Sequence, residues 1–202
     1  MHSAISKMID FIGTPQAEHY LSLAIESCLH EFGEEHDIET LDEVRKIVGE
    51  TVFEQVYPCI LEFFFSNCYM DNDEDPPVPW NVIDEFMKRK ASSLTEEEKI
   101  YLKAIQQSHL SLYEITKIEP EVGLTLRDLI GDHSSIRVLE KGLTRQAKQG
   151  DIVALRVVHE GNEYRLAGGA LNMDPRVAKK TAEMTRALHD AAVTMVRGQM
   201  KY

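Results

Sequence analysis

The densest group of residues that could bind a metal ion lies in the stretch LHEFGEEHD, residues 29–37. A zinc-hydrolase helix carries two histidines one turn apart, with a glutamate beside the first as general base. His30 and Glu34 are one turn apart and His36 follows, but the pattern is HExxE rather than HExxH. Gly33 also weakens the turn. A metal-dependent hydrolase using His30, Glu34 and His36 is therefore an alternative, and a solvated helix end is the favoured interpretation.

Asp128 is the acidic residue whose setting most suggests burial, because it interrupts the apolar segment LRDLI. Pairing with Arg127, Arg137 or Arg156 is expected, and we interpret these four residues as a structural ion pair or a binding face. No serine or cysteine lies in a nucleophile signature, and Gly168–Ala170 lacks the residues of a phosphate-binding loop and is interpreted as the end of a strand. We predict neither catalytic residues nor a cofactor, and an enzyme is the less favoured class.

Basic residues recur in the later part of the chain, and Arg145, Lys148 and Arg165 are the candidates for contact with nucleic acid. Small five-stranded barrels bind oligonucleotides through basic and aromatic side chains on one face. Tyr113 and Tyr164 are the aromatic residues in the predicted strands, so stacking platforms are scarce. Nucleic-acid binding through a basic barrel face is a second alternative, which we disfavour.

The charge distribution also opposes polyanionic partners. The 202 residues include 34 acidic and 22 basic side chains, for a formal net charge of −12, and the excess negative charge lies in residues 1–80. A field of this sign repels phosphate backbones and anionic membranes. Cys28, Cys59 and Cys68 form no CxxC pair, which is typical of reduced thiols in a cytosolic protein. Neither a signal peptide nor a membrane span is predicted, and we expect a cytoplasmic location.

The residues that could do chemistry must be positioned by helices in the first part of the chain. Helical spacing of apolar residues begins at Thr14 and again at Thr40, where TLDE matches a capping box. Pro58 is expected to kink or restart the helix that follows. The stretch DNDEDPPVP, residues 71–79, combines acids with prolines and is predicted to be a linker. A helix follows over 80–90, and a second capping box at Thr95 opens another.

From residue 111 the pattern changes to short β-branched and apolar segments separated by turn residues. Five such segments, between about 111 and 168, predict a small barrel or a bent antiparallel sheet. Asp174 and Pro175 then begin a last helix. One face of this helix carries an apolar stripe, consisting of Val177, Thr181, Met184, Leu188, Ala191 and Met195.

The region from about residue 94 to 175 resembles a helix-plus-small-barrel region of uncharacterised bacterial proteins. The similarity rests on Tyr101, SLYE at 111–114, LRDL at 126–129, the Gly150–Asp151 pair and GGAL at 168–171. Many of those proteins carry a SecA-carboxyl-terminal-type zinc motif elsewhere, and this sequence lacks that motif. The resemblance implies a fold rather than an activity.

These patterns predict an α+β protein. Residues 1–70 form an acidic helical subdomain, 71–79 a linker, and 80–202 a unit of helix, small barrel and C-terminal helix. The favoured function is that of a cytosolic, non-catalytic binding or interaction protein with a protein partner. The apolar C-terminal helix either docks on the protein itself, which is the favoured expectation, or forms a homodimer.

Overall fold

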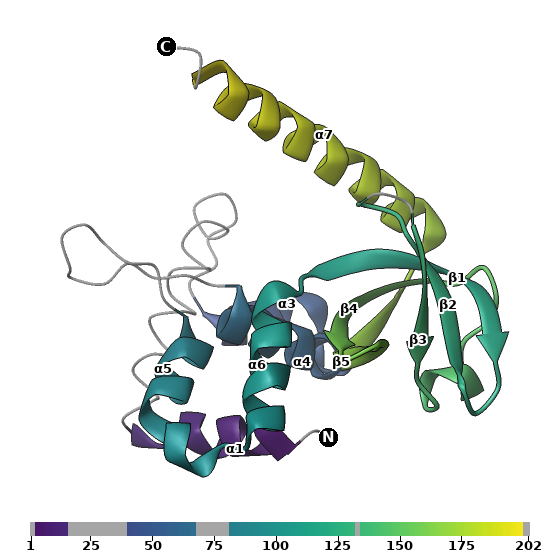
Figure 1. Ribbon diagram of the computed structural model, residues 1–202. Coiled ribbons are helices and arrows are strands. Elements are labelled where there is room, and N and C mark those ends of the chain that lie inside the picture. The colour runs from purple at the N-terminus through teal and green to yellow at the C-terminus, as the bar shows by residue number, and fades with distance from the viewer. Residues whose placement is uncertain (1–2, 16–39, 68–80, 132–133, 200–202) are drawn as a thin grey trace. The chain divides into compact units, whose positions relative to one another are not determined.

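The computed structural model describes residues 3–15, 40–67, 81–131 and 134–199 (Figure 1). The chain divides into two compact units, Met1–His109 and Leu110–Tyr202. The first contains helices, and the second contains a closed five-stranded barrel and the C-terminal helix. The predicted α+β class is therefore confirmed. The predicted linker at 71–79 lies outside the described residues, as does most of the helix predicted from Thr14.

The first unit contains five described α-helices and one short 3-10 helix. Their bounds are α1 (Ser3–Ile12), α3 (Leu41–Val48), α4 (Glu50–Ser66), α5 (Val82–Lys90), η1 (Ala91–Ser93) and α6 (Glu96–Gln107). Both predicted capping boxes are present: Thr40 Oγ1 accepts from Glu43 N–H, and Thr95 Oγ1 accepts from Glu98 N–H. The glutamate side chain returns to the cap N–H in each case, so local sequence determines where α3 and α6 begin.

The helix that was expected to kink or restart at Pro58 restarts earlier in the chain, at Gly49. Gly49 has a φ of +82°, a backbone conformation that glycine adopts without the steric cost of a Cβ atom. The chain therefore turns between α3 and α4, and α4 continues through Pro58 to Ser66. The predicted restart of the helix at Pro58 was wrong, because the chain leaves the helical conformation at Gly49, where a positive φ costs least.

A buried polar network joins α4, α5 and α6. Asn81 is fully buried at the N-cap of α5, and its Nδ2 donates to the Ser66 carbonyl over 3.0 Å. Its Oδ1 accepts from the Asp84 N–H and from Gln106 Nε2, at 3.1 and 2.9 Å. Since a buried amide is stable when its donors and acceptors are satisfied, the network fixes the start of α5 against the ends of α4 and α6.

One ion pair links α1 to the N-terminus of α6. Lys7 Nζ lies 2.7 Å from Glu98 Oε2 and 2.8 Å from the carbonyl oxygen of Ser93. The hydrogen bond from Lys7, followed by that from the Thr95 backbone, lowers the pKa of Glu98 to about 2. Glu98 is 4% exposed and lies in the first turn of α6, where a negative charge is stabilised.

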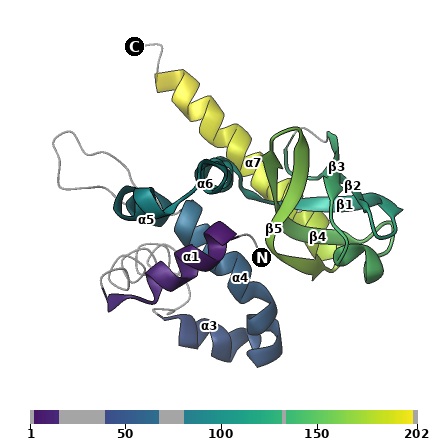
Figure 2. The ribbon, with the colours of Figure 1, turned by 60° about the horizontal axis from the view of Figure 1, so that its bottom comes forward.

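The second unit is built on β1 (Leu110–Glu119), β2 (Gly123–Asp128), β3 (Ser135–Leu139), β4 (Ile152–Glu160) and β5 (Glu163–Met173). The strands close in the order β1-β2-β3-β5-β4 (Figure 2). All neighbours are antiparallel except β3 and β5, which are parallel. A 3-10 helix, η2 (Leu143–Arg145), lies between β3 and β4. The five predicted strands are thus confirmed, and the alternatives of barrel and bent sheet resolve to a closed mixed barrel.

Apolar side chains fill the barrel and also cover part of its outside. The interior cluster comprises Tyr113, Ile115, Leu124, Leu126, Val138, Val153 and Leu155. Alternate residues of β4, Ile152 and Ala154, turn outward and are buried with Ala178 and Ala182 of α7 (Pro175–Gln199). The C-terminal helix therefore rests on the barrel through two alanines, whose small side chains let it approach the strands closely.

Candidate functional site

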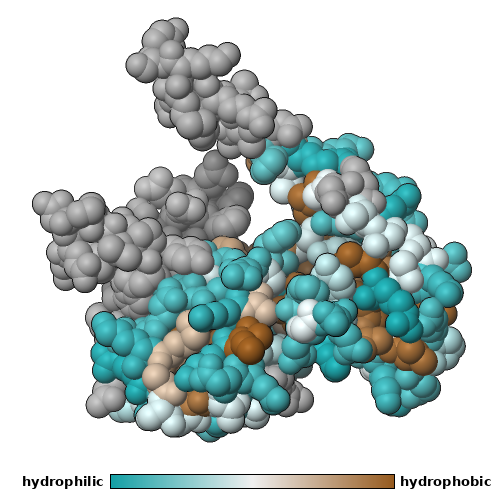
Figure 3. Space-filling view, in the orientation of Figure 1, coloured by the Kyte–Doolittle hydropathy of each residue, from teal (hydrophilic) through white to brown (hydrophobic). Residues whose placement is uncertain are grey.

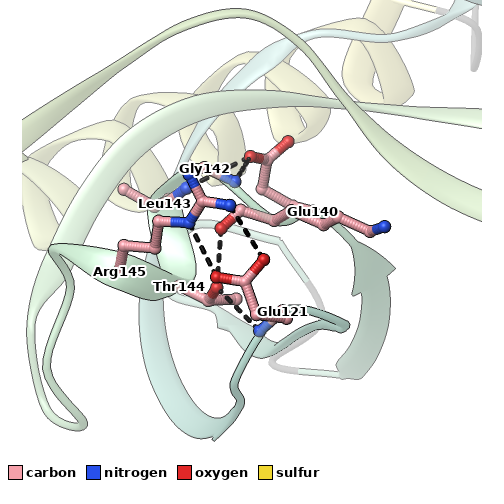
Figure 4. A network of polar contacts seen from close by, with 7 residues as sticks. Glu121, Glu140, Gly142, Leu143, Thr144 and Arg145 are labelled. Atoms are coloured by element: carbon pink, nitrogen blue, oxygen red, sulfur yellow. Dashed lines mark hydrogen bonds and ion pairs between the residues drawn. The ribbon is translucent and has the colours of Figure 1, made fainter.

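Two neighbouring turns of the barrel are held together by a polar network (Figure 4). Arg145 of η2 donates from Nε and Nη2 to the two carboxylate oxygens of Glu121, at 2.7 and 2.8 Å. Thr144 Oγ1 accepts from the Glu121 N–H and donates to the Lys141 carbonyl. Glu140 Oε1 accepts from the N–H groups that follow it in the loop. The connection from β3 to β4 is thereby fixed against the turn between β1 and β2.

Glu121 has an unusual backbone conformation for a residue with a side chain. Its φ is +58°, the one positive value among the described non-glycine residues. Such a conformation persists where surrounding contacts enforce it, and it is enriched at binding sites. The bidentate contact with Arg145 supplies that enforcement.

Two hollows that open to solvent adjoin this network. The larger has a volume of about 560 Å³ and the smaller about 240 Å³, and both are lined by Glu140. The larger lies where β3 meets β5 and is also lined by Glu121, Val122, Leu139, Lys141 and Arg165. The smaller follows β5 and is also lined by Gly142, Leu143, Gln146, Leu166, Gly168 and Ala170. We call the two hollows together the β5 groove.

The smaller hollow of the β5 groove lies beside a stretch of β5 that has no partner strand on that side within the described residues. β3 pairs with β5 at two positions only, Val138↔Tyr164 and Leu139↔Arg165. From Leu166 to Met173, β5 pairs with β4 on its other side. No backbone hydrogen bond within the described part of the chain joins this stretch to the β3–β4 connection. An open edge of this kind presents N–H and C=O groups to another extended chain.

The open edge carries small side chains. Gly168 and Gly169 are inserted between the pairs Arg156↔Ala167 and Leu155↔Ala170, and Gly168 has a φ of +69°. Gly168 and Ala170 are exposed. Glycine within a strand accompanies a bulge or the close approach of another backbone. The strand was predicted to end at these glycines, which was wrong, because β5 continues through the bulge to Met173.

Most arginines of the barrel are neutralised by glutamates on neighbouring strands or turns. Arg127 pairs with Glu114, its register partner on β1. Arg137 and Lys117 both contact Glu119, at 2.6 and 2.9 Å. Hydrogen bonds from Arg137 and then Lys117 lower the pKa of Glu119 to about 2, and Glu119 in turn raises the pKa of Arg137.

Of the three residues predicted to contact nucleic acid, Arg145 and Arg165 also pair with glutamates. Arg145 contacts Glu121, and Arg165 contacts Glu160 and Glu163, at 3.1 and 3.0 Å. Lys148 is exposed in the turn before β4. Figure 3 shows hydrophilic residues over much of the barrel face that Figure 1 presents, with apolar patches between them. The basic residues therefore alternate with acidic ones, which reduces the attraction of this surface for a polyanion.

Asp128 has a structural role at the end of β2. Its Oδ1 accepts from the Ser111 hydroxyl at 2.9 Å and from the N–H groups of Ile130 and Gly131 at 2.9 and 3.1 Å. These contacts close the turn that leaves β2. Arg156, on β4, is 1% exposed. The structure therefore shows Arg127 and Arg137 with glutamate partners and Asp128 as a turn residue.

The candidate metal ligands His30, Glu34 and His36 lie outside the described residues. Within residues 3–15, 40–67, 81–131 and 134–199, no three His, Cys, Asp or Glu side chains are grouped so that they could hold a metal ion. The same part of the chain contains no helix with the length and apolar character needed to cross a bilayer.

Sequence reasoning missed the residues that define the β5 groove. Glu121, Glu140 and Ala170 carry no motif, and their proximity depends on how the barrel closes. The one available signal was the glycine pair at 168–169, since a strand can pass through such a pair as a bulge.

The comparisons with known proteins give a family and no activity. No curated protein and no solved structure matches the chain. A model of a family of unknown function, DUF7986, matches residues 29–171, which covers more than two thirds of the chain and extends from the helical unit into β5. The chain belongs to this family of unknown function, DUF7986.

Proposed function

We propose that the protein is a non-catalytic interaction protein whose barrel binds an extended peptide along β5. The observation that carries the proposal is the open edge from Leu166 to Met173, which begins where the two-residue pairing with β3 ends. A peptide added as a strand would satisfy the N–H and C=O groups that point toward the groove.

The groove also favours a particular kind of peptide. Its apolar lining residues are Val122, Leu139, Leu143 and Leu166. Since alternate side chains of a strand point to the same side, a peptide with apolar residues at every second position would place them on this lining. The exposed glycine and alanine at positions 168 and 170 leave room for the peptide backbone.

Three of the four charged side chains that line the groove, those of Glu121, Glu140 and Arg165, take part in contacts that fix its walls. Glu121 holds Arg145, Glu140 accepts backbone N–H groups of its own loop, and Arg165 contacts two glutamates. These contacts hold the wall rigid without requiring a charged ligand, and a pre-formed wall lowers the entropic cost of binding.

The test uses the full-length protein and a phage library of random twelve-residue peptides. Peptides selected on the wild type are measured by fluorescence anisotropy against Ala170→Arg, which places a long side chain in the groove. Ala187→Arg makes the same substitution at an exposed position of α7 and serves as the matched control. We expect Ala170→Arg to weaken binding about tenfold or more and Ala187→Arg to leave it unchanged.

Hydrogen exchange of the complex locates the peptide. Bound peptide should slow amide exchange within residues 166–172. A library that yields no binder, a binder indifferent to Ala170→Arg, or protection confined to other residues would each overturn the proposal.

A further inference from the structure

Strand β3 closes one end of the space in which a peptide would lie beside β5. β3 and β5 pair in parallel, the last pair is Leu139↔Arg165, and β3 ends at Leu139. The stretch of β5 that has no partner on this side among the described residues begins at the next position, Leu166. A peptide added along that stretch would therefore lie end to end with β3.

The closed end limits the kind of chain segment that fits. The residues of a strand advance by about 3.3 Å each, so a peptide that continued straight past Leu166 would meet the backbone of Leu139. An internal segment of a protein would have to turn sharply away from the sheet at this point. A segment that ends here would not, so the groove favours the terminus of a chain.

The direction of the peptide decides which terminus lies against β3. β5 runs from Glu163 to Met173, so either the N-terminus of a parallel peptide or the C-terminus of an antiparallel one would lie beside Leu166. Antiparallel pairing is the slightly more stable and the commoner arrangement, and it is how β5 already pairs with β4. An antiparallel peptide would place its terminal carboxylate at the closed end of the groove.

A positively charged side chain lines the groove at this end. Lys141 follows the end of β3 by two residues, is exposed, and lines the larger hollow together with Arg165. Arg165 contacts Glu160 and Glu163, whereas Lys141 forms no ion pair within the part of the chain that the structure describes. The ammonium group of Lys141 is therefore the fourth charge of the groove and is available to a ligand.

The two glutamates of the larger hollow are already occupied by hydrogen-bond donors. Arg145 donates to both carboxylate oxygens of Glu121, and Glu140 Oε1 accepts two N–H groups of its own loop (Figure 4). The hydrogen bond from Arg145 lowers the pKa of Glu121 most, and the charge of Lys141 lowers this pKa further, so Lys141 acts on the groove wall. A carboxylate beside Lys141 would gain a charge-assisted hydrogen bond.

We propose that the β5 groove binds the free carboxyl terminus of a protein partner, with the last strand of the partner antiparallel to β5 and its carboxylate beside Lys141. The last residues of most domains are poorly ordered unless they are tied down, so such an end is available to add as a strand. This inference rests on the proposed binding of a peptide to β5 and names the class of peptide.

The test uses the full-length protein and peptides from two phage libraries, one displayed with a free carboxyl terminus and one with a free amino terminus. A selected peptide is measured by fluorescence anisotropy in four forms: the free acid, the C-terminal carboxamide, and the peptide with a short Gly-Ser extension after its C-terminus or before its N-terminus. We expect the N-terminal extension to have no effect. The carboxamide and the C-terminal extension should each weaken binding about tenfold or more.

A variant of the groove tests the role of the lysine. Lys141→Gln should weaken binding of the free acid about fivefold and leave binding of the carboxamide unchanged, because the carboxamide has no charge to lose. Lys180→Gln, at an exposed position of α7, is the matched control and should leave both affinities unchanged. Circular dichroism checks that both variants are folded.

The outcomes separate this inference from the proposed function. A carboxamide or a C-terminal extension that binds as tightly as the free acid would overturn the inference while peptide binding to β5 stands. Weaker binding on N-terminal extension alone would show the opposite direction and would overturn it as well. An equal loss for free acid and carboxamide in Lys141→Gln, or no loss for either, would contradict the contact with the carboxylate. Failure of both libraries would overturn the two proposals together.

Discussion

Arg145 donates two hydrogen bonds to the carboxylate of Glu121, which has a positive φ at the turn between β1 and β2. The contact is largely exposed, so its contribution to global stability is small. Its effect is local, because it connects two loops that line the β5 groove. A rigid loop pair at an open strand edge is the geometry that the proposed peptide site needs.

The backbone of Glu121 gives the first prediction. Glu121→Ala and Glu121→Gly both remove the carboxylate. An alanine at this position still has the steric cost of a Cβ atom at positive φ, whereas a glycine does not. We expect Glu121→Gly to melt at a higher temperature than Glu121→Ala. Differential scanning calorimetry of the two variants tests this, and equal melting temperatures would show that the turn relaxes when Arg145 is released.

Gly123 begins β2 at a point where there is no space for a side chain. A Cβ atom placed there would lie 2.2 Å from the carbonyl oxygen of Val138 on β3. Gly123→Ala should therefore destabilise the barrel by about 3 kcal/mol, since backbone must move to remove the clash. Gly13→Ala, where the nearest atoms are 3.7 Å away, is the control and should cost far less in urea denaturation.

Asn81 gives a prediction about burial at a helix cap. Asn81→Ala removes the cap of α5 and leaves the Ser66 carbonyl and Gln106 Nε2 without that partner in a buried setting, which should cost about 3 kcal/mol. Thr40→Ala breaks the same kind of capping box at an exposed site and should cost about 1 kcal/mol. Unfolding both variants in denaturant measures the two losses of unfolding free energy. Equal losses would show that burial of the cap does not add to its contribution.

Glu98 gives a prediction about pH. Its folded-state pKa of about 2 lies below the ordinary value of 4.5, so the Lys7 contact stabilises the fold fully above pH 4.5. That stabilisation is lost as the pH falls from 4.5 through 2. Lys7→Gln should lower the melting temperature near pH 6 and flatten its decline below pH 4.5. Lys46→Gln is the control, and an unchanged profile in Lys7→Gln would contradict the assignment.

The alternation of charges on the barrel gives a prediction about nucleic acid. We expect no binding of single-stranded DNA or RNA at moderate salt, because Arg127, Arg137 and Arg145 each face a glutamate. The triple variant Glu114→Gln/Glu119→Gln/Glu121→Gln should gain weak binding that disappears as salt increases. Electrophoretic mobility shifts measure both, and a wild-type shift that survives moderate salt would revive the nucleic-acid alternative.

Local signals predicted the elements well. The capping boxes at Thr40 and Thr95, each a motif of four residues, determine where α3 and α6 begin. The segments rich in β-branched residues form the five strands. The capping box at Asn81 was missed, although its Asn-x-x-Asp spacing was present in the sequence. Features that depend on contacts between neighbouring residues of the chain are accessible to this kind of reasoning.

Features that depend on strand register were not accessible. The partner of Arg127 is Glu114 because those two residues are opposite in the β1–β2 pair, and composition alone does not give that register. The face of α7 that packs on the barrel could not be predicted from hydrophobicity either. Hydrophobicity alone would place Met184 and Leu188 in the buried face, whereas the residues that contact the barrel are alanines. A helix that approaches a sheet closely selects small residues, and the larger apolar side chains of α7 then remain exposed.

The brevity of the β3–β5 pairing has a consequence for how the barrel assembles and opens. The β1–β2–β3 meander and the β4–β5 hairpin each form from neighbouring segments, so little chain entropy opposes them. The two parallel pairs of β3 with β5 join segments distant in sequence and contribute few bonds. Because it is the shortest of the five pairings, we expect the β3–β5 contact to form after the meander and the hairpin, and to part first in transient openings of the native state.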